Sequence, residues 1–126
     1  MDKEQKQRIE ELKRQAQINI QKQKLQKNVL LQECLSALNS YRFIDDNEVK
    51  QIIDIVSMSN AELYSHDDLI VLGDEEQYYI VWDEASLPVV LCLGKYINEF
   101  WDDVVAVAFD TYFVAESTRK VIGIRH

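Results

Sequence analysis

Residues 77–93 read QYYIVWDEASLPVVLCL, and this stretch decides the fold class. Two runs rich in β-branched, aromatic and leucine residues, 77–82 and 89–93, flank a short polar break that ends at Pro88. Such runs are typical of β-strands, and a break this short favours a hairpin. We therefore expect an antiparallel pair, because a parallel pair needs a longer crossover.

Three further runs of the same kind predict three more strands. They span residues 69–72, 104–114 and 121–124. Apolar residues at helical spacing predict a short helix over about residues 95–101, between the third and fourth strands. The strands are apolar on both faces, which implies that helices pack on at least part of the sheet.

The N-terminal part of the chain predicts a long helix. No Gly or Pro occurs from Asp2 to Leu38, and strong helix formers dominate. Residues 1–28 are expected to project from the core or lie at its periphery, because their apolar row is thin. This row consists of Ile9, Leu12, Ala16 and Ile20.

A second helix is predicted over about residues 46–57, because Asp45 and Glu48 form an acidic variant of the capping box. The sequence thus predicts one α+β domain over residues 1–126, with its compact core in 29–126. In this fold, N-terminal helices precede a mostly antiparallel sheet of about five strands with one short inserted helix.

The charge of the chain is distributed unevenly. The formal net charge is −8, yet residues 1–60 carry +1 and residues 61–126 carry −9, with 13 acids against four bases. A strongly acidic surface repels nucleic acid and anionic membranes and suits a basic protein partner. No apolar stretch is long enough for a spanning helix or an export signal, so we expect a cytoplasmic protein.

The residues needed for catalysis or metal binding are scarce. His66 lies beside acids in a polar break, which is more typical of a solvated loop than of half a metal site. No nucleophile motif, Cys-x-x-Cys pair or glycine-rich phosphate loop occurs. Cys34 and Cys92 are expected to be reduced and buried. The sequence therefore predicts no catalytic residue, no metal site and no cofactor, although paired acids leave a metal-dependent enzyme as a weak alternative.

Acids at the polar breaks between strands are the first candidates for contact with a partner, because such breaks present side chains outward. Asp102, Asp103 and Asp110 are weaker candidates, because acids at these positions can cap the short helix or order the fourth strand. Three aromatic residues are candidate anchors, although the core is their more usual place. The full set is Asp67, Asp68, Asp74, Glu75, Glu76, Asp83, Glu84, Asp102, Asp103, Asp110, Tyr79, Trp82 and Tyr112.

The stretch from Asp68 to Ile124 resembles immunity proteins of bacterial contact-dependent growth inhibition systems. The residues that carry the resemblance are 68–72, 79–83, 87–90, 102–112 and 121–124, and three blocks among them, in this order, are the more specific part. The closing strand departs from the family pattern at Gly123, where an acid is expected. The blocks are Trp82-Asp83, Leu87-Pro88 and the run from Asp102-Asp103-Val104 to Phe109-Asp110-Thr111.

This resemblance implies a cytoplasmic protein that binds and neutralises one cognate toxin domain, commonly a nuclease, and has no activity of its own. The first 60 residues lie outside the resemblance. They leave a second hypothesis open, a non-enzymatic adaptor or structural protein that associates, or self-associates, through its N-terminal helix. An immunity gene should lie directly downstream of a large toxin gene, whereas an adaptor has no such neighbour.

Overall fold

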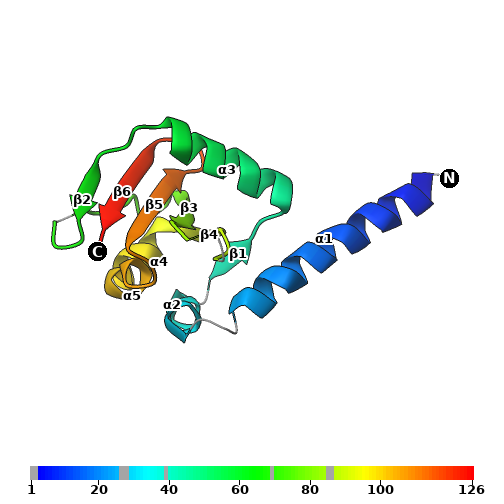
Figure 1. The fold of residues 1–126 in the computed structure, drawn as a ribbon, viewed down its shortest axis with the longest axis horizontal. Helices are drawn as coiled ribbons and strands as arrows, with labels where there is room; N and C mark the ends of the chain where they lie inside the picture. The colour runs from blue at the N-terminus through cyan, green and yellow to red at the C-terminus, as the bar shows by residue number, and fades with distance from the viewer. Residues whose placement is uncertain (1–2, 26–28, 39, 69, 85–86) are drawn as a thin grey trace.

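The computed structural model describes residues 3–25, 29–38, 40–68, 70–84 and 87–126. Figure 1 shows one sheet with helices on both of its faces, which confirms the predicted α+β class. The elements in chain order are α1 (Lys3–Leu25), α2 (Val29–Leu38), β1 (Tyr41–Phe43), α3 (Asp46–Met58), β2 (Leu63–Ser65), β3 (Gln77–Trp82), β4 (Val90–Leu93), α4 (Gly94–Glu99), α5 (Trp101–Val105), β5 (Asp110–Ala115) and β6 (Val121–Arg125).

The sheet has six strands in the order β1-β4-β3-β5-β6-β2. All neighbouring pairs are antiparallel except β2 and β6, which are parallel, so the sheet is mixed. The prediction of about five strands omitted β1 and β2. Each of these strands has three residues and lies at an edge of the sheet, so each carries too short a pattern to be recognised.

Both faces of the sheet are apolar, as predicted. On one face, side chains of β3, β4 and β5 pack against α2, α4 and α5, and this cluster includes Tyr78, Ile80, Trp82, Val90, Cys92 and Phe113. On the other face, Tyr79, Val81, Leu91 and Val114 pack against α3, whose Ile52 is fully buried. Neighbouring residues of a strand therefore belong to different halves of the core.

The helix α3 begins as predicted. The side chain of Asp45 accepts a hydrogen bond from the backbone N–H of Glu48 at 2.9 Å, which caps the first turn. The structure describes two helices, α1 and α2, within the predicted long helix, and residues 26–28 between them lie outside the described part. Figure 1 shows that α1 extends away from the sheet.

The predicted strand over residues 69–72 is wrong for Ile70, Val71 and Leu72, which have no regular secondary structure, and Leu69 lies outside the described residues. A side chain takes the place of a neighbouring strand here. The Asn98 amide accepts from the Leu72 N–H at 2.9 Å and donates to the Leu72 carbonyl at 2.7 Å. A single asparagine thus satisfies both backbone groups of Leu72.

The predicted strand over residues 104–114 is also wrong in its first part, where Val104 and Val105 end helix α5. Both valines are buried against the sheet, so packing overrides their preference for strands. The strand itself begins at Asp110 and extends one residue past the prediction, to Ala115. The predicted helix over 95–101 corresponds to α4 together with the start of α5.

Candidate functional site

The strand pairing places one group of acids at a single end of the sheet. Asp67 and Asp68 follow β2, Asp83 and Glu84 follow β3, and Asp110 begins β5. Because β2, β3 and β6 run in the same direction and β5 runs against them, these positions meet at the same end. We call this end, defined by Asp67, Asp68, Asp83, Glu84 and Asp110, the acidic end.

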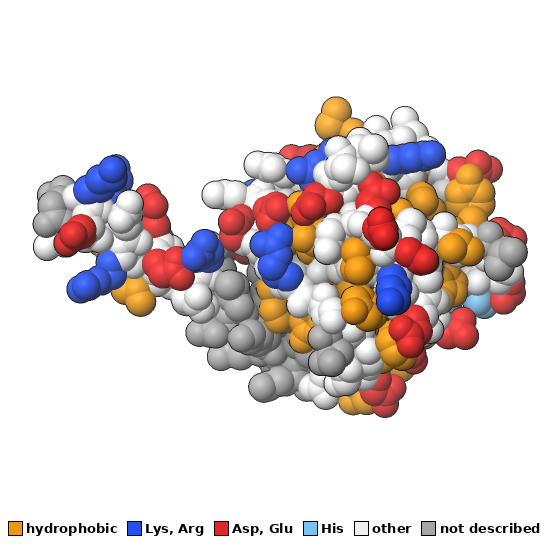
Figure 2. Space-filling view, turned by 180° about the vertical axis from the view of Figure 1, so that it is seen from behind, with side chains coloured by type: hydrophobic (Ala, Val, Ile, Leu, Met, Phe, Trp, Pro, Cys, Tyr) orange, Lys and Arg blue, Asp and Glu red, His pale blue; other side chains and the backbone are white. Residues whose placement is uncertain are grey.

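Backbone hydrogen bonds hold the acidic end together across strands. The Asp83 N–H donates to the Asp110 carbonyl at 2.9 Å, and the His66 N–H donates to the Arg125 carbonyl at 3.0 Å. In Figure 2 the pale blue histidine surface at the right margin lies among red acidic side chains. The acids are therefore presented from a fixed backbone.

The helix α5 brings two more acids towards this end. The Trp101 indole donates to the His66 carbonyl at 3.5 Å, and the Trp82 indole donates to the Val104 carbonyl at 2.9 Å. Both hydrogen bonds join α5 to the acidic end, because His66 follows β2 and Trp82 is the last residue of β3. The exposed residues Asp102 and Asp103 of α5 thereby add to its negative charge.

Arg125 is the basic residue that the strand ends bring to the acidic end. Its Nε donates to the Asp110 carboxylate at 3.1 Å, and this hydrogen bond raises the pKa of Arg125. The pKa of Tyr112 is raised by burial and then by the negative charges of Asp110 and Asp83. Arg125 acts in the opposite direction and lowers the pKa of Tyr112, but burial and the two acids outweigh it.

Two acids of this end have local partners. The Asp68 carboxylate accepts from the backbone N–H of Ser65 at 3.0 Å and shapes the turn after β2. The Asp67 carboxylate lies 3.2 Å from Nε2 of His66, whose ring stacks on that of His126 with a centroid separation of 4.8 Å. His66 thus lies in a loop beside acids, as the sequence predicted, and the side chains of this turn help to hold its shape.

The acids Asp74, Glu75 and Glu76 lie at the opposite end of the sheet, before β3. This end carries both acidic and basic side chains, and we call it the mixed end. A six-residue strand separates the two ends by about 20 Å, so the predicted partner-binding acids do not form one cluster. The charged residues of the mixed end are Asp74, Glu75, Glu76, Lys95, Glu116, Arg119 and Lys120.

Hydrogen bonds connect the segments at the mixed end. The Gly94 N–H donates to the Glu76 carbonyl at 2.8 Å, and the Lys95 N–H donates to the Asp74 carbonyl at 3.2 Å. The Ser117 hydroxyl donates to the Glu76 carboxylate, which links the turn before β3 to the turn between β5 and β6. Basic side chains close to these acids reduce the net charge there.

Two of the three candidate aromatic anchors are in the core. Trp82 is 3% exposed and Tyr79 is 1% exposed, so neither can make direct contact with a partner. The Tyr79 hydroxyl donates to the Glu48 carboxylate at 2.8 Å, and the Arg119 guanidinium lies 5.3 Å from its ring centroid. Tyr112 is partly buried against α3. The structure therefore removes Tyr79 and Trp82 from the candidate contact surface.

The sequence analysis missed one aromatic residue at the acidic end. Phe109, immediately before β5, is 70% exposed. It was not singled out because it falls within the apolar run predicted as a continuous strand. The change from Ala108-Phe109 to Asp110 was the available signal, since an apolar-to-acidic step can mark a strand end.

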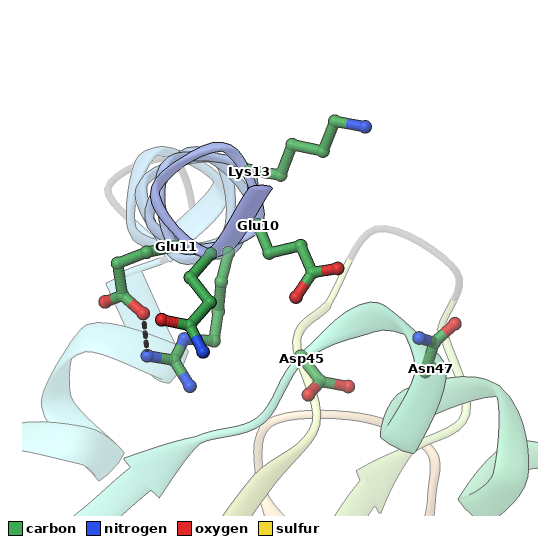
Figure 3. Close-up of a pocket in the computed structure, with 7 residues that line it drawn as sticks. Glu10, Glu11, Lys13, Asp45 and Asn47 are labelled. Atoms are coloured by element: carbon green, nitrogen blue, oxygen red, sulfur yellow. Dashed lines mark hydrogen bonds and ion pairs between the residues drawn. The ribbon is translucent and has the colours of Figure 1, made fainter. Parts of the chain in front are cut away.

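The described residues line several surface depressions. One, of about 680 Å³, lies between α1 and the start of α3 and is lined by acids, bases and amides. In Figure 3 Glu10 and Asp45 point into this space, whereas Lys13 points away from it. Among the described residues, no group of three or more His, Cys, Asp or Glu could hold a metal ion, and no helix is long and apolar enough to span a membrane.

The buried thiols have the wrong pKa for nucleophiles. Cys34 and Cys92 are free, and burial raises the pKa of Cys34 to about 12 and that of Cys92 to about 11. A reactive cysteine needs a lowered pKa, because the thiolate is the attacking form. Both cysteines are therefore parts of the core, as the sequence predicted.

Comparison with known protein families matches residues 57–126 to the family described as CdiI immunity protein EcoliA0-like. Comparison with curated proteins found no match. The matched region covers more than half of the chain and includes both ends of the sheet as well as α4 and α5. The predicted resemblance is therefore confirmed, and the chain belongs to the CdiI immunity protein family.

Proposed function

We propose that this protein neutralises its cognate toxin by direct contact through the acidic end. The partner is a toxin domain with a basic substrate cleft, of which a nuclease is the best example, because a nuclease must attract phosphate. The immunity protein acts by occupying this surface in the cytoplasm and catalyses no reaction itself. Its role requires complementary charge and a rigid shape rather than a reactive group.

The charge balance of the acidic end supports this proposal. Its five acids and the two acids of α5 face one strand-end base, Arg125, which already pairs with Asp110. At the mixed end, Lys95, Arg119 and Lys120 accompany four acids. Of the two ends, the acidic end therefore attracts a basic surface more strongly.

The experiment uses the C-terminal toxin domain of the protein encoded immediately upstream. Association rates are measured between 0.05 and 0.5 M salt, over which the Debye length falls from above about 10 Å to a few Å. We expect association to slow about tenfold or more, because electrostatic steering is screened. Wild type and two double variants are compared.

The test variant is Asp83→Lys with Asp102→Lys, and the matched control is Asp74→Lys with Glu75→Lys. Both change the net charge by the same amount, and all four side chains are exposed. We expect the test variant to associate slowly and with a weaker dependence on salt, and the control to lose less. Equal losses in both would show that only the net charge matters, and normal binding by both would remove the acids from the interface.

A second proposal concerns α1. Residues 1–28 contain eight bases and four acids, whereas residues 29–126 contain six bases and 18 acids. The described side chains of α1 are exposed, including Leu12 at 64%. We propose that this basic helix associates with the acidic compact part of a second copy, because basic and acidic surfaces attract. Sedimentation of the full chain in low and high salt tests this association.

A further inference from the structure

Phe109 is an exposed aromatic residue on an otherwise charged surface. Its side chain is 70% exposed, although phenylalanine is among the residues most often buried. It lies between α5 and β5, directly before Asp110. The protein thus presents a large apolar ring at the end of the sheet where acids are in excess.

The backbone around Phe109 is fixed from both sides. Its carbonyl accepts a hydrogen bond from the His126 N–H at 2.8 Å, and the next carbonyl, of Asp110, accepts from the Asp83 N–H at 2.9 Å. A phenylalanine on such a backbone has only two side-chain torsions to lose when it binds. An aromatic side chain held in this way gives much contact area at a low entropic cost.

Charged groups border the ring. The Arg125 guanidinium lies 5.7 Å from the ring centroid, and its Nε holds the Asp110 carboxylate at 3.1 Å. Asp83 lies beside Asp110 across the β3–β5 pairing. An apolar group enclosed by charged neighbours is the usual arrangement of a binding hot spot, in which the rim excludes water from the centre.

Two other strongly exposed apolar side chains lack this setting. Met58 is 82% exposed, but it ends α3 in an apolar depression bordered by Arg119 and Lys120. Val71 is 69% exposed on the irregular segment before the mixed end, and valine is under-represented at hot spots. Of these three residues, Phe109 is the one that combines an aromatic ring with acidic neighbours.

We propose that Phe109 is the aromatic anchor of the toxin interface, entering an apolar pocket of the toxin domain whose rim carries Lys or Arg. The acids Asp83 and Asp110 face this basic rim, while the ring fills the pocket. This inference rests on the proposed function and deepens it. The acids set the rate of association, and the ring sets the rate of dissociation.

The experiment measures binding of the same toxin domain to Phe109→Ala, to Phe109→Tyr and to the matched control Met58→Ala. We expect Phe109→Ala to raise the Kd at least about tenfold, mostly through faster dissociation, as hot-spot truncations do. Phe109→Tyr should keep most of the affinity, and Met58→Ala should bind like the wild type. Melting temperatures should remain unchanged, because an exposed ring contributes little to the core.

Three results would overturn the anchor. The first is an affinity of Phe109→Ala within twofold of the wild type. If the double variant Asp83→Lys with Asp102→Lys still associates slowly in that case, the acidic end remains the proposed interface, without Phe109 as its anchor. The second is a change of the free protein from dimer to monomer on Phe109→Ala, which would make a second copy the partner of the ring. The third is a wild type that does not bind the toxin domain, in which case the proposed function itself fails.

Discussion

The indole Nε1 of Trp82, at the end of β3, donates a hydrogen bond to the carbonyl oxygen of Val104, in α5, at 2.9 Å. This bond joins the last strand residue before the acidic end to the helix that carries Asp102 and Asp103. It satisfies a buried donor and one carbonyl near the end of the short helix. Trp82 therefore affects the acidic surface indirectly, because its buried side chain positions α5.

The variant Trp82→Phe should lower the free energy of unfolding by about 1–3 kcal/mol, because it leaves the Val104 carbonyl without this donor. Binding of the toxin domain should change only through the position of α5, since the indole itself is buried. Urea denaturation and binding at low temperature check both expectations. A large loss of affinity with unchanged stability would return Trp82 to the contact surface.

The variant Gly94→Ala should be strongly destabilising. A Cβ at Gly94 would lie 2.1 Å from the Gly73 carbonyl oxygen, which is backbone and cannot move aside without displacing the turn before β3. We expect a loss of more than about 2 kcal/mol, in the range of overpacked core sites. Thermal unfolding measures the loss.

Gly73→Ala is the matched control for this clash. A Cβ at Gly73 would meet its nearest neighbours at ordinary contact distances of 3.4–3.6 Å, and the residue does not have a positive φ angle. We expect a change within about 1 kcal/mol. Similar melting temperatures for the two alanine variants would contradict the close approach of the two glycines.

The buried thiols predict a loss of stability at alkaline pH. Their pKa is raised from an ordinary value of 9.0, to about 12 for Cys34 and about 11 for Cys92. Well below pH 9 both thiols are protonated in the folded and unfolded chains. As the pH rises through 9 the unfolded chain loses protons that the folded chain keeps, so the free energy of unfolding falls, with a slope for each thiol that approaches about 1.4 kcal/mol per pH unit near pH 10.

Urea denaturation at pH 8, 9 and 10 checks this slope, and Cys34→Ala should reduce it by about half. The range stops at pH 10 because the pKa of Tyr79 and that of Tyr112 are raised too, from an ordinary value of 10.0, so the contribution of these groups to the alkaline loss grows from about that pH. An unchanged slope in Cys34→Ala would assign the alkaline loss to other groups.

A chain that begins at Gln26 should keep a cooperative thermal transition, because the described α1 side chains are exposed and contribute little to the core. The same truncation should abolish any self-association that depends on α1, as measured by sedimentation at low salt. Loss of the cooperative transition would show that α1 is required for the fold.

The central elements of the fold were predictable because each has a clear period or a clear start. The continuous apolar run of Gln77–Trp82, which is buried on both faces, and the Asp45 cap of α3 both depend on residues close in sequence. The edge strands and the end of α5 were not predictable, because their structure depends on remote partners. Val104 is helical and packs in the same core cluster as Trp82, and in the run from Val104 to Val114 the step from Phe109 to Asp110 is a weak local sign of the change.

The candidate site was predictable in composition and not in arrangement. The sequence shows an excess of acids, but the direction of the strands separates Asp74, Glu75 and Glu76 from the other acids. Exposure was the harder property. Tyr79 and Trp82 are in the core while Phe109 is exposed, and only the packing of α3 and α5 against the two faces decides which aromatic side chains are covered.

The parallel pairing of β2 with β6 has a consequence for protein synthesis. β2 leaves the ribosome early, but its partner β6 is made about 60 residues later, which takes seconds at roughly 5–20 residues per second. The acids after β2 and β3 are translated before the strands that hold them together. A nascent chain that still lacks β6 therefore carries most of the acids, but the acidic end through which we propose that the toxin is bound is complete only after β6 has emerged.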